Sequence, residues 1–99
     1  MKTLGIFITS DQYQEYAAAL ARAARRQGLT VRMHFTGSGV RLIERPEFEQ
    51  LAALAHHSSI CRESAAWFQV EDRIQGPQTL PPFRQMAGII RMCDRYLFI

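Results

Sequence analysis

The sequence predicts a small α/β protein in which helices pack on both faces of a mostly parallel sheet. Three observations favour this class. Short apolar runs alternate along the chain with segments of helical periodicity, which is the pattern of βαβ units. The 99 residues, 47% of them hydrophobic, are enough for one core and too few for two. No internal repeat divides the chain. We therefore expect a single domain over residues 1–99, built as a three-layer α/β/α sandwich.

The first 35 residues predict a βαβ unit. Leu4–Thr9 is a nearly continuous apolar run, as in a strand buried on both faces. Ser10 or Asp11 is expected to cap the helix that follows, and Gly28 to end it. Leu29–Phe35 is rich in β-branched and aromatic residues and reads as the second strand. A connection of this length joins parallel strands.

The remainder of the chain continues the alternation of strands and helices. Glycine and proline residues mark its turns, and apolar residues recur at strand or helix spacing between them. The predicted elements are a turn at Thr36–Gly39, a strand at Val40–Ile43, a helix from Pro46, a strand at Ser59–Cys61, a helix at Ser64–Val70, a loop at Glu71–Pro82, a helix around Phe83–Ile90 and a strand at Tyr96–Ile99.

Charge and hydropathy exclude several classes of partner. The net charge of +3 comes from 12 basic and 9 acidic residues that alternate in sign, and only Arg22, Arg25 and Arg26 lie close together. A solvated helix face explains that cluster, so we expect no nucleic-acid binding. The first apolar run is too short for a signal peptide, and no run approaches membrane-spanning length. We expect a cytoplasmic protein with no membrane association.

The two cysteines, Cys61 and Cys93, are expected to be separate reduced thiols. They form no CxxC motif, and the histidines do not stand at ligand spacing from them, so we expect neither a metal site nor a disulfide framework. Cys93 follows Met86 and Ile89 at helical spacing, which predicts core packing.

Polar and reactive residues follow three of the predicted strands. In a parallel sheet, ligands and catalytic groups gather at the carboxyl ends of the strands. The residues expected at that edge are Ser10, Asp11, Gly37, Ser38, Gly39, Cys61 and Arg62. Among them the Cys61 thiol is the strongly nucleophilic group, so Cys61 is the candidate catalytic residue and the others the candidate pocket.

The order and spacing of these segments resemble the DsrE/DsrF/TusD-like (DsrEFH-like) sulfur-relay family. The resemblance extends over essentially the whole chain and includes a helix-ending glycine before the second strand and a glycine turn after it. The segments that carry it are Thr9-Ser10-Asp11, Gln27-Gly28-Leu29-Thr30-Val31, Phe35-Thr36-Gly37-Ser38-Gly39-Val40 and Cys93-Asp94-Arg95-Tyr96-Leu97-Phe98.

The resemblance implies a five-stranded parallel sheet and assembly into homo- or hetero-oligomers with DsrE-like subunits. It also implies a cysteine that holds sulfane sulfur as a persulfide, with sulfur donor and acceptor proteins as partners and no metal or organic cofactor. Cys61 matches the position of that cysteine. The protein is thus expected to act as a sulfur carrier or sulfurtransferase.

Each of these features has a second interpretation. The backbone amides of a following helix and Arg62 favour a Cys61 thiolate in an exposed position, but a buried cysteine also serves as a small hydrophobe. A non-catalytic oligomeric binding or interaction module on the same scaffold is therefore the alternative function. The Gly37–Gly39 turn is a weaker candidate for binding a nucleotide phosphate. Trp67, Phe68 and Phe83 either cover a subunit interface or roof the core.

Overall fold

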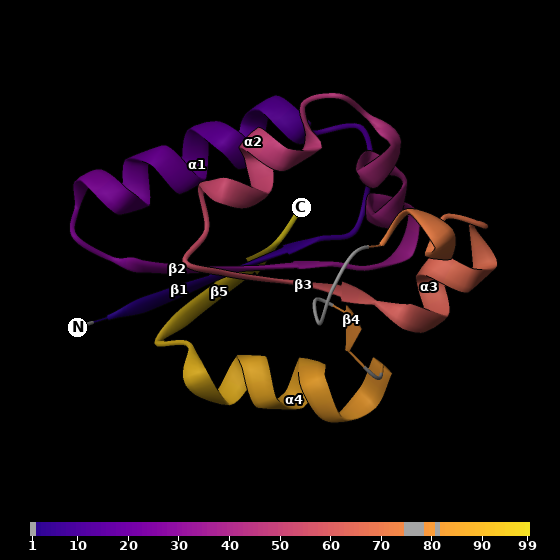
Figure 1. Cartoon of the computed structure of the whole chain (residues 1–99). Coiled ribbons are helices and arrows are strands. Elements are labelled where there is room, and N and C mark those ends of the chain that lie inside the picture. Colours follow the sequence, from indigo (N-terminus) through magenta and orange to yellow (C-terminus); the bar gives the residue numbers. More distant parts are fainter. Residues whose placement is uncertain (1, 75–78, 81) are drawn as a thin grey trace.

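The computed structural model describes residues 2–74, 79–80 and 82–99. Helices α1 and α2 lie on one face of a sheet and α4 lies on the other (Figure 1). The strands are β1 (Thr3–Ile8), β2 (Thr30–Phe35), β3 (His57–Cys61), β4 (Thr79–Leu80) and β5 (Arg95–Phe98). The helices are α1 (Gln14–Arg26), α2 (Phe48–Ala53), α3 (Arg62–Trp67) and α4 (Pro82–Met92), together with two 3₁₀ helices, η1 (Gly37–Glu44) and η2 (Glu71–Arg73).

All strand pairs of the sheet are parallel, in the order β4-β3-β2-β1-β5. β1 and β2 pair from Thr3 with Thr30 to Ile8 with Phe35, and α1 connects them. The predicted βαβ unit at the start of the chain is confirmed. The carboxyl ends of β1, β2 and β3 lie at the same edge of the sheet, since Phe35 pairs with Ile8 on one side and Ile60 on the other.

Strand alternation divides the buried residues between the two faces of the sheet. Val31, Met33 and Phe35 of β2 are buried in the main core, which α1 and α2 cover. Full burial of such side chains contributes roughly 1.5–3 kcal/mol each. The residue between the last two, His34, points to the α4 face. By the same alternation Cys61 shares the face of His34, because Ile60 belongs to the main core.

The α/β class and the parallel sheet are confirmed, but the predicted strand Val40–Ile43 is wrong. This segment lies in η1. β2 is flanked by β1 and β3, so no sheet edge is open beside it for the segment that follows. In the described part of the chain, β3, β2, β1 and β5 form a four-stranded body of the sheet. The two-residue β4 extends it at one edge, where Cys61 pairs with Leu80.

Two helices, α1 and α3, begin differently from the prediction. α1 begins at Gln14 with no side-chain cap, so the prediction that Ser10 or Asp11 caps it is wrong. Gly28 follows its last turn with a φ of 78°, as predicted. α3 begins at Arg62 with Cys61 in the N-cap position. The predicted loop 71–82 contains η2, β4 and the first residue of α4, while its residues 75–78 and 81 lie outside the described residues.

None of the described helices combines the length and the apolar composition that crossing a bilayer requires.

Candidate functional site

Cys61 occupies the junction between a strand and a helix. It is the last residue of β3 and the N-cap of α3, with φ −67° and ψ 116°. Because Phe35 pairs with Ile60, the next residue of each strand, Thr36 and Cys61, also lie side by side at the carboxyl edge. The fold thus brings together the ends of β2 and β3 and the first turn of α3.

Hydroxyl and amide groups surround the Cys61 thiol. The Ser64 hydroxyl accepts a hydrogen bond of 2.9 Å from the Gly37 amide and lies 3.4 Å from the Thr36 hydroxyl. A hydroxyl carries one proton, so accepting from Gly37 leaves the Ser64 proton free to donate. Cys61 has hydrogen bonds with the Ser64 hydroxyl and amide, the Thr36 hydroxyl and the Glu63 amide. These groups make a polar cradle for the sulfur.

The cradle outweighs burial in setting the ionisation of Cys61. Burial raises the pKa of the thiol, but the hydrogen bonds from Ser64, Thr36 and Glu63 lower it by more, so the net pKa lies below the ordinary value. Arg62 is exposed and is not among the causes of this shift. The expected contribution of the Arg62 charge is therefore not found, whereas the Glu63 backbone amide lowers the pKa of the thiol.

Of the two interpretations of Cys61, exposed thiolate or buried side chain, the structure shows the buried position. Its relative exposed surface is 6%, whereas Cys93 is partly exposed. The strand end is covered by the segments that meet there, as Cys61 has β2 on one side and β4 on the other. We therefore expect a reagent to reach this sulfur when the fold opens locally.

The two glycine amides of the turn after β2 are engaged within the protein. The Gly37 amide donates to the Ser64 hydroxyl, and the Gly39 amide donates to the Thr36 carbonyl at 3.0 Å. Gly39 is buried so tightly that a Cβ atom there would collide with the carbonyl oxygen of Ile8. The phosphate-binding interpretation of this turn therefore loses two of its backbone donors.

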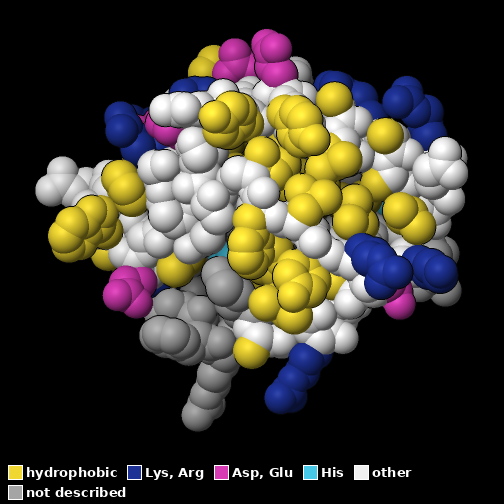
Figure 2. All heavy atoms as spheres, turned by 180° about the vertical axis from the view of Figure 1, so that it is seen from behind, with side chains coloured by type: hydrophobic (Ala, Val, Ile, Leu, Met, Phe, Trp, Pro, Cys, Tyr) yellow, Lys and Arg dark blue, Asp and Glu magenta, His cyan; other side chains and the backbone are white. Residues whose placement is uncertain are grey.

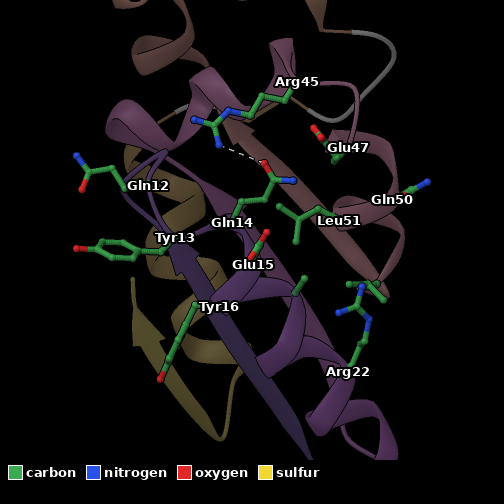
Figure 3. A pocket seen from close by; sticks show the side chains of 12 residues that line it. Gln12, Tyr13, Gln14, Glu15, Tyr16, Arg22, Arg45, Glu47, Gln50 and Leu51 are labelled. Carbon is green, nitrogen blue, oxygen red and sulfur yellow. Dashed lines mark hydrogen bonds between the residues drawn. The ribbon is translucent and has the colours of Figure 1, made fainter.

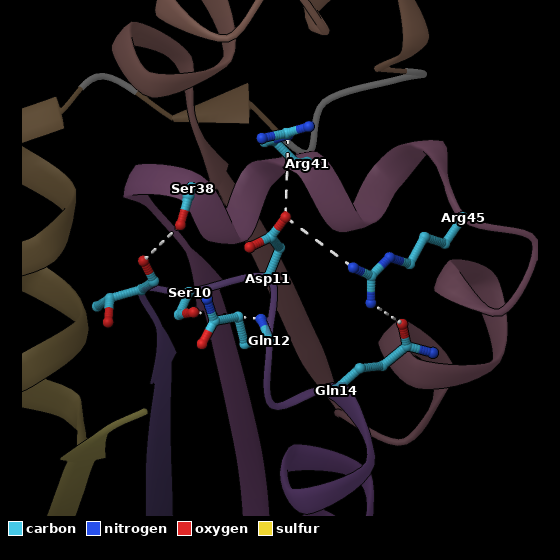
Figure 4. Close-up of polar contacts among 8 residues, drawn as sticks. Ser10, Asp11, Gln12, Gln14, Ser38, Arg41 and Arg45 are labelled. Carbon is cyan, nitrogen blue, oxygen red and sulfur yellow. Dashed lines mark hydrogen bonds and ion pairs between the residues drawn. The ribbon is translucent and has the colours of Figure 1, made fainter.

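Ser10, Asp11 and Ser38 belong to a separate polar network (Figure 4). The Asp11 carboxylate lies 3.9 Å from the guanidinium groups of both Arg41, in η1, and Arg45, which follows η1. The Ser10 hydroxyl accepts from the Gln12 amide at 3.2 Å, and Ser38 donates to the Thr9 carbonyl at 3.4 Å. These contacts tie the segment after β1 to η1. Of the predicted pocket residues, Gly37 therefore joins the Cys61 cradle through Ser64, while these three hold the neighbouring loop.

Sequence reasoning missed Ser64 and Thr36, although one signal pointed to Ser64. It stands three residues after Cys61, and the third position of a helix is the one from which a polar side chain can reach back to the N-cap residue, as Glu or Gln does in a capping box. Placing the helix start at Ser64 instead of Arg62 hid that relationship.

A buried pair, His34 and Ser59, lies on the same face of the sheet as Cys61. The His34 Nδ1 atom is 2.6 Å from the Ser59 hydroxyl, and both residues are buried. Burial lowers the pKa of His34 to about 4, so the ring is neutral at physiological pH. Its Nε2 atom has no hydrogen-bond partner among the described residues. No sequence pattern indicated this pair, because its residues meet only through strand register.

Cys93 lies far from Cys61 along the strands. A Cβ atom at Gly5 would come within 2.6 Å of its sulfur, which places it near the start of β1. Burial raises its pKa, Arg32 lowers it and Asp94 raises it, with a net increase. Both cysteines are free thiols, in agreement with the prediction that they do not pair.

A groove on the described surface lies away from Cys61. It has a volume of about 740 Å³ and runs beside α1, with Gln14, Arg22, Arg45, Leu51 and Leu54 among its lining residues (Figure 3). Arg45 donates a hydrogen bond of 3.3 Å to Gln14 across it. The lining mixes both signs of charge and gathers no nucleophile, so we assign the chemistry to Cys61 and not to this groove.

In the part of the chain that the structure describes, no group of three or more His, Cys, Asp or Glu residues is arranged to hold a metal ion. Comparison with known proteins adds no family: no protein-family model matches the sequence, and no curated protein matches it at a significant level.

Proposed function

We propose that the protein is a DsrE-like sulfur carrier that accepts sulfane sulfur as a persulfide on Cys61. The observation that carries the proposal is the polar cradle of Cys61. Burial alone raises the pKa of a thiol, as at Cys93, whereas Cys61 is buried and its pKa is nevertheless lowered. Hydrogen bonds that favour an anion at a strand end suit a residue that works as a thiolate.

The chemistry requires only thiols and persulfides. The Cys61 thiolate attacks the outer sulfur of a donor persulfide, R–S–SH. A new S–S bond forms at Cys61, the donor's S–S bond breaks, and the donor leaves as the thiolate R–S⁻, so no external oxidant or reductant is used. In the second step an acceptor thiolate attacks the outer sulfur, and Cys61 leaves as a thiolate. Ser64 and Thr36 stabilise the Cys61 anion before the first step and after the second.

Two features of the fold support the DsrE-like assignment. Helices lie on both faces of a parallel sheet, which suits the three-layer α/β/α class that the resemblance implies (Figure 1). Cys61 ends β3 at the carboxyl edge, and within the four-stranded body of the sheet β5 is the strand that follows β3 in the sequence. Two free thiols suit the reducing cytoplasm, where we place the protein together with its sulfur donor and acceptor proteins.

The second candidate is a non-catalytic interaction module on the same scaffold. The burial of Cys61 favours it, because a thiol with 6% exposed surface also acts as a small core residue. The two candidates differ in one property, the ability of the Cys61 sulfur to react in the folded protein.

Mass spectrometry of the intact protein after incubation with a small persulfide donor tests the proposal. We expect a gain of one sulfur atom in the native protein and in the Cys93→Ser variant, and none in Cys61→Ser. Peptide mapping of the native protein then places the added sulfur on Cys61.

The Cys93→Ser variant is the matched control, since it removes the other thiol of the chain. Sulfur carried by Cys61→Ser, or no mass gain on Cys61 while the denatured protein reacts, would overturn the relay proposal and leave the interaction module.

A further inference from the structure

The two edges of the sheet differ in how well they are protected. β4 forms one edge with only two residues, and Pro81 and Pro82 follow it directly in the sequence. Short length and proline are the usual devices that prevent a sheet edge from pairing with another chain. The opposite edge strand, β5, has four residues and no proline, and Arg95 at its start is its only charge. β5 is the unprotected edge.

The backbone of β5 has hydrogen-bonding groups directed outward. The Ile99 amide donates to Phe7 and the Ile99 carbonyl accepts from Thr9, both at 2.8 Å, so Ile99 faces β1. Successive residues of a strand direct these groups to opposite sides, so those of Phe98 and Tyr96 point away from β1. No strand pairs with β5 on this outer side in the described part of the chain.

Aromatic side chains line the same edge. Tyr96 is 50% exposed and Phe98 57% exposed. Both rings pack edge-on against the buried Phe7, with ring-centre distances of 6.1 and 5.0 Å. The buried Phe7 ring holds the rings of Tyr96 and Phe98 in place. These two side chains therefore lose less conformational entropy when an interface forms.

The flank of α1 above β5 adds to this surface. Arg25 bonds to the Leu54 carbonyl of α2, which fixes the flank of α1 that faces α2. Tyr16 stands nine residues earlier, about half a turn out of phase at roughly 100° per residue, so it projects from the opposite flank. It is exposed. Figure 2 shows hydrophobic side chains gathered in a band across this side of the molecule, with few charges among them.

We propose that β5 pairs with β5 of a second copy of this chain, in antiparallel orientation about a two-fold axis at Leu97. This register follows from the outward groups of Tyr96 and Phe98. Tyr96 then lies opposite Phe98 of the second copy, and the two residues exchange both backbone hydrogen bonds. Directly opposed residues share a face, so each pair is also an aromatic pair. Arg95 meets Ile99 of the second copy, so no like charges are opposed.

A second copy of the chain is the partner that fits β5, because an identical edge meets the requirements for hydrogen bonding, ring packing and charge at once. A two-fold interface uses the same patch on both subunits, and this patch is complementary to itself in hydrogen bonding, ring packing and charge. A half-exposed aromatic side chain contributes on the order of 100 Å². Tyr13 and Tyr16 project to the same side of the molecule (Figure 3). These two residues, Tyr96 and Phe98 are each at least half exposed, so the four rings in two copies contribute roughly 800 Å². The paired backbones of β5 bring the interface toward about 1,000 Å², the lower bound for a specific interface.

Sedimentation velocity of the native chain and of two lysine variants tests the proposal. The native chain should form a dimer in the micromolar range, and Phe98→Lys should weaken self-association at least tenfold, because it places two like charges beside the axis. Trp67→Lys is the matched control. Trp67 is the most exposed aromatic residue of the described side chains, at 82%, and lies in α3 away from β5, so this variant should dimerise like the native chain.

A crosslink tests the register without depending on the lysine variants. The two Leu97 residues form a non-hydrogen-bonded pair with Cα atoms about 4.5 Å apart, which suits a disulfide. Oxidation of Leu97→Cys should therefore give a dimer linked through residue 97 in peptide maps. A native chain that stays monomeric at millimolar concentration, or a dimer that Trp67→Lys dissociates and Phe98→Lys does not, would overturn the proposal.

Discussion

The Ser64 hydroxyl accepts a 2.9 Å hydrogen bond from the Gly37 amide and so joins the turn after β2 to the first turn of α3, beside Cys61. The same hydroxyl has a hydrogen bond with the Cys61 thiol that lowers its pKa. One side chain thus holds the two segments together and stabilises the thiolate, and these two roles can be measured separately.

Replacing Ser64 with alanine should raise the pKa of Cys61. The thiol loses a side-chain hydrogen bond that lowers its pKa, and the Gly37 amide loses its acceptor. An unmet amide costs about 1–2 kcal/mol of folding free energy. The pH dependence of Cys61 alkylation and urea unfolding measure the two effects. Ser38→Ala, which removes a hydroxyl bonded to Thr9 in the same turn, is the control and should leave the alkylation profile unchanged.

The pKa of Cys61 should lie below that of an ordinary thiol, and the pKa of Cys93 should lie above it. Burial raises the pKa of Cys61 but its hydrogen bonds lower it by more, while burial and Asp94 raise the pKa of Cys93 against the effect of Arg32. Alkylation rates of the Cys93→Ser and Cys61→Ser variants, followed across pH, report each midpoint separately. The midpoint pH reports the pKa of Cys61 even though burial of the thiol slows the alkylation rate itself. If alkylation of Cys93 had its midpoint at a lower pH than alkylation of Cys61, the claim that the polar cradle lowers the pKa of Cys61 would be wrong.

Stability should fall on acidification because of His34. Its folded pKa of about 4 lies below the unfolded value of 6.5, so the unfolded state binds more protons between these two values. The contribution to stability is complete above pH 6.5 and is lost as the pH falls through about 4. A shift of this size corresponds to about 3 kcal/mol. Urea unfolding of the native chain and of His34→Gln should differ in pH dependence within this window. Equal slopes would show that His34 is not buried as described.

The class of fold was predictable because its signals are local. The apolar run at Leu4–Thr9 and the glycine that ends α1 are properties of short segments; β1 lies within one residue of the first, and Gly28 follows α1 as the pattern predicts. Val40–Ile43 was mistaken for a strand because apolar residues flank the charged Arg41 in the sequence, an alternation that the burial of Val40 and Leu42 and the exposure of Arg41 match. Alternation predicts a strand only where a sheet edge is free, and β2 has neighbours on both sides.

The site was less predictable because its contacts join distant segments. The position of Cys61 at a strand end follows from the sequence, but its 6% exposure depends on β2 and β4 beside it. The Ser64 and Gly37 contact spans 27 positions, and the His34 and Ser59 contact spans 25. Such pairs are fixed by strand register, which a single sequence does not show.

Alanine substitutions at two glycines distinguish the effect of a steric collision from the general effect of replacing a flexible glycine. Gly39 lies under the end of β1, where a Cβ atom would collide with the Ile8 carbonyl oxygen and meet the Ile8 side chain at 3.2 Å. Backbone cannot move aside as a flexible side chain can, so Gly39→Ala should destabilise the protein by roughly 1–3 kcal/mol. Because Gly39 lies in the first turn of η1, two residues after Gly37, the same variant should also disturb the Cys61 cradle and shift its alkylation midpoint.

Gly88 provides the matched substitution within α4. Among the described residues nothing lies within 4 Å of a Cβ atom at this position, and alanine is the better helix former, so Gly88→Ala should stabilise the protein by about 0.5–1 kcal/mol. Thermal unfolding of the two variants under the same conditions compares them directly. If both were neutral, the turn after β2 would not be packed against β1. If both were destabilised equally, a general effect of alanine and not the contact with Ile8 would be responsible.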